Sequence, residues 1–235
     1  MAVKSGFNGF PEGSVTFYSD LRENNNKQWF DAHKGDFETF VLQPARDFVF
    51  EMGKALKKIS PGIIADPRVN KSIFRPYRDT RFSKDKTPYK THLGIFMWEG
   101  NRAKMECPGY YLHLEPPHLM LGAGIHCFSK PLLEQYRESV VDPKRGPALA
   151  EALQQVKQKG EYSIGVKHYK KMPRGYDAAG ENAELLLFNG LTAAFVTDIP
   201  KEFYTERLIH YCFEKFRDIS PIQKWLLDMI GRIDK

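Results

Sequence analysis

The segment from Lys71 to His92 carries the densest chemistry of the chain and reads KSIFRPYRDTRFSKDKTPYKTH. Seven lysines and arginines stand there against two aspartates, so the segment holds a net charge of +5, out of +6 for the whole chain. Aromatic rings lie between these charges, whereas disordered tails are poor in aromatic residues. Guanidinium and ammonium groups in a folded loop are typical donors to phosphate or carboxylate. The segment therefore predicts an anion site.

We expect the cations of this loop to hold the anion. Arginines offer forked donors and lysines offer compact positive charges. Each charge-assisted contact contributes roughly 1.5–3 kcal/mol, so two or three contacts would bind a small anion with roughly micromolar affinity. The candidate ligand-binding residues of the loop are Arg75, Arg78, Arg81, Lys84, Lys86 and Lys90.

The alternative is a structural network inside the loop, in which Asp79 and Asp85 pair with arginines. Two carboxylates do not neutralise the seven cations of the segment, and this excess favours a bound ligand. The 29 acidic residues of the whole chain nevertheless supply further partners, so both interpretations stand.

A face of polar and small side chains is expected on the strands that follow the loop. Successive side chains of a strand point to opposite faces, so Tyr111, His113 and Glu115 share one face. Gly122 and Gly124 of the next strand fall across from them and would leave room for a ligand above the sheet. Alternatively, the glycines admit a packed helix and the histidines are ordinary hydrogen-bonded residues. The expected pocket, next to the basic loop, is lined by His92, Tyr111, His113, Glu115 and His126.

The histidines of this pocket are the candidates for proton transfer. If the protein is an enzyme, His92 or His113 would act as general acid or base, and the arginines would stabilise charge in the transition state. The residue pattern leaves open whether it is an enzyme. Histidine and glutamate are also zinc and iron ligands, and His113, Glu115 and His126 form such a set. The excess of cations would repel a metal ion, so we predict no metal and no other cofactor.

A second basic segment, Lys167–Arg174, reads KHYKKMPR and precedes Gly175. We expect Arg174 to complete the anion site from another side. The alternative is an exposed basic loop without a ligand.

Helices should precede and follow these segments. Apolar residues recur at helical spacing near residues 17–21, 29–41 and 44–59, with Pro44 in the first turn of the third stretch. Later helices are expected to open at Pro131, Pro147, Pro200 and Ser220-Pro221, and a short one at Ala183–Phe188.

The middle of the chain reads as β-structure. Pro116-Pro117 cannot lie inside a central strand and so joins the third and fourth strands as a hairpin. The strand segments are too close together for crossover helices. This spacing indicates an α+β fold, a mostly antiparallel sheet flanked by N- and C-terminal helices. We expect a single domain over residues 1–235, with an ordered core of about 14–231. The expected strands are Val69–Arg75, Leu93–Trp98, Tyr110–Glu115 and Leu119–Cys127, with an edge strand at Leu191–Thr197.

The composition is that of a globular protein with a sizeable core, since 42% of the residues are apolar and 13% are aromatic. No stretch approaches the roughly 18 consecutive apolar residues that a membrane span needs. The first residues lack the apolar region of a secretory signal. Three cysteines are odd in number and lack CxxC spacing, which argues against a disulfide framework. We therefore expect a cytoplasmic protein without a membrane anchor.

Several short motifs spread along the chain together carry a family resemblance. They are Asn25-Asn26-Lys27, Trp29-Phe30, Ile73–His92, Gly109–His113, Gly122–Gly124 and Met172–Asp177. With these motifs the chain resembles the domain-of-unknown-function family 2461 (DUF2461), conserved hypothetical proteins, from about Phe17 to Trp225. The resemblance implies one intact intracellular domain. It implies no activity, cofactor or catalytic residue.

These observations favour an intracellular protein that binds a phosphorylated or polycarboxylate small molecule through its Arg/Lys-rich loop. A nucleic-acid-binding module is the alternative, because Phe74, Tyr77, Phe82 and Tyr89 stand among the cations and could stack on bases. A protein-interaction module with a structural arginine network is a third interpretation. The sequence leaves open the identity of the ligand, the reaction and the oligomeric state.

Overall fold

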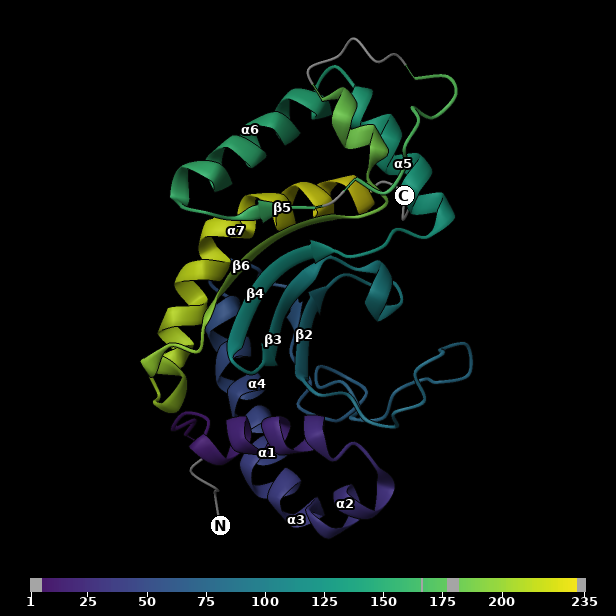
Figure 1. The fold of residues 1–235 in the computed structure, drawn as a ribbon. Coiled ribbons are helices and arrows are strands. Elements are labelled where there is room, and N and C mark those ends of the chain that lie inside the picture. Colours follow the sequence, from purple (N-terminus) through teal and green to yellow (C-terminus); the bar gives the residue numbers. More distant parts are fainter. Residues whose placement is uncertain (1–5, 166, 177–181, 232–235) are drawn as a thin grey trace. The chain divides into compact units, whose positions relative to one another are not determined.

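The structure, a computed structural model, describes residues 6–165, 167–176 and 182–231. The predicted α+β class is confirmed: helices accompany a six-stranded antiparallel sheet with strand order β1-β2-β3-β4-β6-β5 (Figure 1). The strands are β1 (Ile63–Ile64), β2 (Leu93–Glu99), β3 (Gly109–Glu115), β4 (His118–Ile125), β5 (Ser163–Ile164) and β6 (Leu191–Asp198).

The residues group into two compact units. The first unit comprises Met1–Met97, Tyr111–Leu121 and Val196–Glu214. The second comprises Trp98–Tyr110, Gly122–Phe195 and Lys215–Lys235. Strands β2, β3, β4 and β6 each contribute residues to both units.

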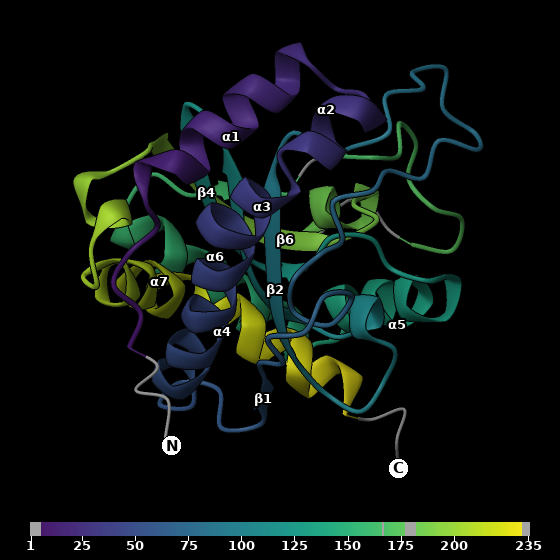
Figure 2. The same ribbon diagram turned by 90° about the horizontal axis from the view of Figure 1, so that it is seen from below.

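The N-terminal helices of the first unit are α1 (Glu12–Glu23), α2 (Lys27–Ala32), α3 (Lys34–Asp36) and α4 (Gln43–Leu56), seen together in Figure 2. A π-helical stretch, Phe37–Leu42, links α3 directly to α4. The expectation of two separate helices at 29–41 and 44–59 is therefore wrong. The wide turn accommodates Pro44, whose ring and missing N–H do not fit a regular α-helix.

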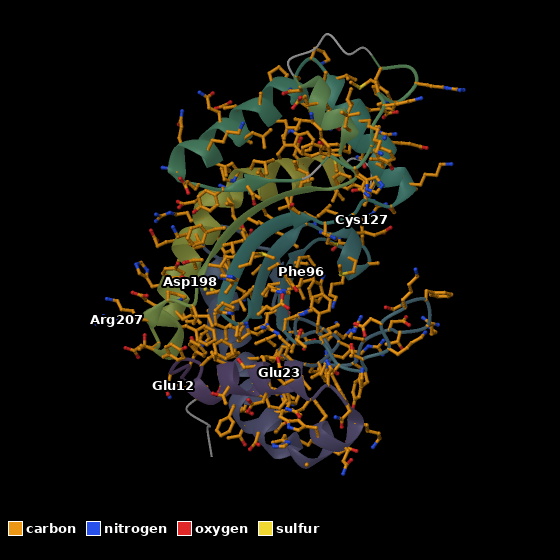
Figure 3. The ribbon with its side chains drawn as sticks, in the orientation of Figure 1. Glu12, Glu23, Phe96, Cys127, Asp198 and Arg207 are labelled. Carbon is orange, nitrogen blue, oxygen red and sulfur yellow. The ribbon has the colours of Figure 1, made fainter. Side chains whose placement is uncertain are left out.

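Aromatic packing forms the core of this unit. Phe10 stacks on Phe203 of the short 3-10 helix Lys201–Tyr204, with ring centroids 4.9 Å apart. Helix α1 buries Phe17 against the ring of Phe30. Its charged residues Glu12 and Glu23 stay exposed near the two ends of the helix (Figure 3).

A long loop between β1 and β2 carries the basic segment and holds no named helix or strand (Figure 1). The predicted strand Val69–Arg75 is wrong. Around Ile73 the loop joins β2 through backbone bonds from Phe74 N–H to the Gly94 carbonyl and from Phe96 N–H to the Ser72 carbonyl, without forming a continuous strand. Asn70, with φ at +68°, turns the chain before them, and Pro76 follows and cannot donate.

The predicted hairpin of β3 and β4 through Pro116-Pro117 is confirmed. The strand expected at Leu191–Thr197 is also present as β6, but it is not an edge strand because β5 pairs with its outer side. Gly124 does not open space above the sheet as expected. Its φ is +126°, and a Cβ there would lie 2.1 Å from the Leu191 carbonyl oxygen, so Gly124 allows close backbone approach of β6.

The helices of the second unit lie where the prolines predicted them. They are α5 (Lys130–Val141) and α6 (Arg145–Lys159), and a 3-10 helix, Ala183–Leu187, forms the predicted short element. Trp225 of the last helix fixes α6 by donating from Nε1 to the Arg145 carbonyl at 3.1 Å.

The C-terminal expectation of two helices is wrong. After the 3-10 helix Lys201–Tyr204, one α-helix, α7 (Leu208–Ile230), continues through Pro221. Proline cannot donate to the carbonyl four residues earlier, which is that of Arg217. The Ser220 hydroxyl donates to this carbonyl at 2.8 Å and so replaces the missing bond.

The three cysteines are free, as predicted: Cys107 and Cys212 are buried and Cys127 is exposed. Among the described residues, no helix combines the length and the apolar character required to cross a bilayer.

Candidate functional site

The basic loop and the end of α1 line an open cavity of about 400 Å³ in the first unit. Three of the predicted site residues, Arg78, Lys90 and His92, line it. The complete lining is Arg22, Asn25, Arg78, Asp85, Thr87, Tyr89, Lys90, Thr91 and His92.

Asn25 holds the loop at the cavity. Its Nδ2 donates to the Tyr89 carbonyl at 2.9 Å, and the Tyr89 N–H donates to its Oδ1 at 3.0 Å. The Tyr89 ring is buried and stacks on Phe30, with centroids 4.0 Å apart. This contact fixes the backbone immediately before Lys90 and His92.

The two aspartates of the loop pair with arginines, as the structural interpretation predicted. Nη1 of Arg78 donates to both Asp85 and Thr87. The backbone N–H of Thr87, followed by the Arg78 guanidinium, lowers the pKa of Asp85 to about 2. The Arg81 guanidinium bonds Asp79 at 2.9 and 2.6 Å and likewise lowers its pKa to about 2. Part of the loop charge is therefore internally compensated.

Four predicted ligand-binding cations do not line the cavity. All four are exposed: Arg75, Arg81, Lys84 and Lys86. Nζ of Lys86 donates to the Thr80 carbonyl at 2.8 Å, a contact that shapes the loop. The cavity therefore brings together a smaller set of cations than the whole basic segment.

The cavity keeps cations without a carboxylate partner. Within the described ranges, no ion pair forms to Lys90 or to Arg22. Lys90 lies over the Phe74 ring at 5.2 Å, and burial together with the charge of Arg75 lowers its pKa. Arg22 donates from Nη2 to the Pro116 carbonyl at 2.8 Å. Neither cation has a carboxylate at ion-pair distance among the described residues.

A polar chain of side chains runs along one face of β3, as the alternation predicted. The Tyr111 hydroxyl lies 3.1 Å from Nδ1 of His113, and Nε2 of His113 lies 3.3 Å from Oε2 of Glu115. The His92 ring lies beside that of His113, with centroids 4.3 Å apart. The two candidate acid–base histidines are therefore neighbours.

The surroundings of this chain shift its ionisation. Burial, and then the proximity of His113, lowers the pKa of His92 to about 4 despite the opposing charge of Glu115. Burial, and then Glu115, raises the pKa of Tyr111 to about 12. Burial also acts to raise the pKa of Glu115, but the His113 hydrogen bond and the nearby His113, His92 and Arg22 charges outweigh it and lower that pKa. His92 is accordingly a neutral imidazole near pH 7.

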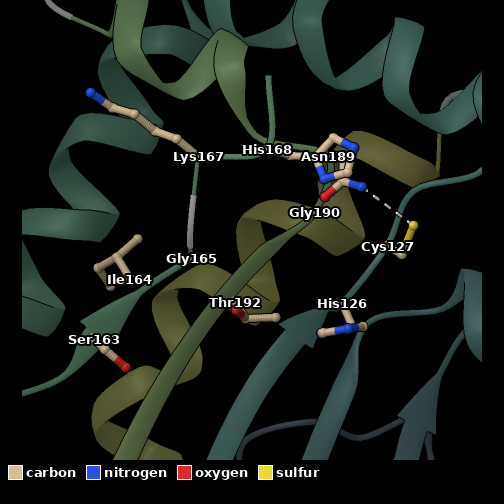
Figure 4. Close-up of a pocket in the computed structure, with 10 residues that line it drawn as sticks. All are labelled: His126, Cys127, Ser163, Ile164, Gly165, Lys167, His168, Asn189, Gly190 and Thr192. Carbon is tan, nitrogen blue, oxygen red and sulfur yellow. Dashed lines mark hydrogen bonds between the residues drawn. The ribbon is translucent and has the colours of Figure 1, made fainter. Parts of the chain in front are cut away.

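His126 and Arg174, which the sequence grouped with this site, belong to the second unit. His126 lines another cavity of about 400 Å³, shown in Figure 4 with Cys127, His168 and Asn189. Nδ2 of Asn189 lies 3.7 Å from the Cys127 sulfur there. Arg174 is exposed. Neither residue is part of the lining around Lys90.

Sequence reasoning missed Arg22, Asn25 and Thr91 as lining residues of the cavity. Arg22 and Asn25 precede the basic loop by some fifty residues. The local sequence around them predicts only that a helix ends there. The motif Asn25-Asn26-Lys27 contributed to the family resemblance, yet nothing in that motif indicated which residue would meet the loop.

A comparison with protein families identifies the chain. The family model described as "Conserved hypothetical protein (DUF2461)" matches residues 13–225, so the chain belongs to this family. No curated protein and no solved structure matches the chain. The family description carries no activity, and the function must be argued from the site.

Proposed function

We propose that this DUF2461 member binds a small phosphorylated or polycarboxylate anion in the cavity that Arg22, Arg78 and Lys90 line. One observation carries the proposal: three cationic side chains meet at one cavity. The single carboxylate among its lining residues, Asp85, is already hydrogen-bonded to Arg78 and Thr87. An added anion would balance the remaining positive charge.

The dimensions and donors support a small ligand. A volume of about 400 Å³ lies within the range of roughly 300–1,000 Å³ that is usual for small-molecule sites. Thr87 and Thr91 place hydroxyl groups in the lining beside the cations. The bonds of Arg78 to Asp85 and Thr87 use Nη1, which leaves Nε and Nη2 for a ligand.

Lys90 is the most informative cation of the site. Burial and Arg75 lower its pKa, so its ammonium group gains from a negative partner more than a solvated lysine does. The exposed cations of the loop, such as Lys84, would attract an anion from a distance without touching it.

The proposal includes the subcellular location of the protein. We place the protein in the cytoplasm because its three cysteines are odd in number and lack disulfide or metal spacing. That pattern is typical of a reducing compartment.

Calorimetric titration of the full chain with phosphate, pyrophosphate, sugar phosphates and citrate tests the proposal. We expect one of these compounds to bind saturably, with Lys90→Met weakening it about 10-fold or more, the loss of one charged contact. The matched control is Lys84→Met, an exposed lysine outside the cavity. Equal effects of the two variants, or no saturable binding of any compound, would contradict a cavity site.

Nucleic acid is a second candidate because of two exposed rings at the loop. Phe82 is 96% exposed and Tyr77 is 52% exposed. The Arg81 guanidinium lies over the Phe82 ring at 5.8 Å. Such rings stack on bases of single strands. Binding that increases with oligonucleotide length, falls with salt at about −0.7 per phosphate in a log–log plot and is lost in Phe82→Ala would favour this candidate over the small anion.

A further inference from the structure

Three side chains of the first unit bring metal-ligand atoms together. One ligand atom each of His92, His113 and Glu115 lies within 4.8 Å of the other two. His113 and Glu115 share a face of β3, and His92 directly precedes β2, the neighbouring strand. We propose that they form a binding site for a divalent transition-metal ion, zinc or iron(II). The site goes beyond the anion proposal, because none of Arg22, Arg78 and Lys90 is a ligand.

The ligand types and spacing fit such an ion. Two imidazoles and a carboxylate are a known ligand set of zinc and of non-haem iron. Ligand atoms bound at about 2.0–2.2 Å lie roughly 3–3.5 Å from one another. Nε2 of His113 and Oε2 of Glu115 are 3.3 Å apart, so an ion bridges them without a large movement of either side chain.

Tyr111 supplies the outer contact that a metal-binding histidine needs. Its hydroxyl lies 3.1 Å from Nδ1 of His113, the nitrogen that faces away from Glu115. A hydroxyl both donates and accepts. It therefore accepts from Nδ1–H when the lone pair of Nε2 binds the ion, which fixes both tautomer and ring orientation.

Gly94 makes room for this contact. A Cβ at position 94 would lie 2.7 Å from the Tyr111 hydroxyl oxygen. Glycine on the adjacent strand β2 thus lets the tyrosine reach His113. Gly94 and Tyr111 therefore support the orientation of His113 within the cluster.

Three protein ligands leave coordination positions open, as in catalytic metal sites and unlike closed structural ones. His92 also lines the cavity that holds Lys90. The nearby cations weaken metal binding, and an anion bound beside them offsets that repulsion. Linkage then requires the anion and the metal to strengthen each other's binding by the same factor.

Titration of the EDTA-stripped, dialysed full chain with Co²⁺, followed by visible absorption and by competition with Zn²⁺, tests the site. We expect one ion per chain, with His113→Ala and Glu115→Gln each weakening it about 100-fold or more, and Tyr111→Phe about 10-fold. His118→Ala is the matched control, because His118 is an exposed histidine paired with Asp198 outside the cluster.

Glu115→Gln keeps the shape of a side chain that is 46% exposed, so it remains informative if His113→Ala fails to fold. The proposal is overturned if the wild-type chain shows no saturable one-to-one binding. It is equally overturned if folded Glu115→Gln binds like the wild type, or if His118→Ala loses as much affinity. Lys90→Met is expected to retain Co²⁺ binding, which separates a failure of the metal site from a failure of the anion site.

Discussion

Asn25 and Tyr89, 64 residues apart in the chain, exchange two hydrogen bonds, one in each direction. An asparagine side chain thereby pairs with a backbone as a neighbouring strand would. The contact joins the turn between α1 and α2 to the end of the basic loop. The three cations proposed to touch the anion, Arg22, Arg78 and Lys90, lie on the two segments that this contact joins.

Removal of the Asn25 side chain should therefore loosen the site as well as the fold. Asn25→Ala leaves the buried backbone of Tyr89 without either partner, which costs about 1–3 kcal/mol. For a chain of this size, each kcal/mol lowers the melting temperature by roughly 2–4 °C. Thermal unfolding and hydrogen exchange over residues 76–92 measure the two effects. Asn24→Ala, which removes an exposed bond to the Asp20 carbonyl, is the control and should change far less.

The two paired arginines of the loop should behave differently. Arg78 lines the cavity with a side chain that is 27% exposed, whereas Arg81 is 76% exposed and bonds only its own turn. We expect Arg78→Ala to weaken anion binding about 10-fold, the loss of one charged contact, and to lower the melting temperature. Arg81→Ala should leave anion binding unchanged and, because its pair with Asp79 is exposed, lower the melting temperature less than Arg78→Ala does. Calorimetry and thermal unfolding of both variants check this, and a stronger effect of Arg81→Ala on binding would refute the assignment.

Acid should weaken the loop through Asp79 and Asp85, whose pKa values are lowered to about 2 by their arginine and backbone donors. A carboxyl whose pKa is lower in the folded than in the unfolded chain stabilises the fold above its ordinary pKa near 4, and this contribution disappears as the pH falls towards 2. The difference in melting temperature between wild type and Asp79→Asn/Asp85→Asn should be constant between about pH 8 and 5 and shrink below about pH 4.

A difference that stays the same from about pH 5 down to about pH 2 would show that ionisation of these two carboxyl groups does not stabilise the folded loop. The exposed Asp20 forms no ion pair among the described residues, so Asp20→Asn serves as the control.

A methyl group at position 94 should disturb the β3 cluster. In Gly94→Ala the new Cβ meets the Tyr111 hydroxyl at 2.7 Å and a ring carbon of Phe74 at 3.0 Å, so the tyrosine must move away from His113. We expect the affinity for Co²⁺ to fall about 10-fold, as for other lost outer contacts. Gly35→Ala, where a Cβ would meet nothing within 4 Å, should leave that affinity intact. Unchanged affinity in Gly94→Ala would mean that Tyr111 does not orient His113.

The sequence predicted elements whose patterns are local. The alternation of Tyr111, His113 and Glu115 correctly placed these residues on one face, and Pro116-Pro117 correctly marked the hairpin. Predictions failed where the structure depends on a contact with a distant residue or on a contact that replaces a lost hydrogen bond. Pro221 read as a helix start, because the Ser220 hydroxyl that replaces the lost backbone bond has no pattern of its own.

In the candidate site, too, residues with a local sequence signal were predicted, and residues brought in by long-range contacts were not. Arg78, Lys90 and His92 were identified because their types stand out within one short segment. Arg22 and Asn25 were not, because only the tertiary fold brings the end of α1 to the loop. His126 lines a different cavity from these residues, and strand alternation predicts a face of the sheet but not a position along it.

The exposed ring of Phe82 offers a practical optical probe. At 96% exposure, with the Arg81 guanidinium at 5.8 Å from the ring centre, its replacement disturbs little packing. A Phe82→Trp variant would place an indole on the tip of the basic loop, where its emission senses water and nearby groups. A change of emission or lifetime that appears in Phe82→Trp but not in the wild type, whose three tryptophans lie elsewhere in the chain, would identify molecules that approach the loop.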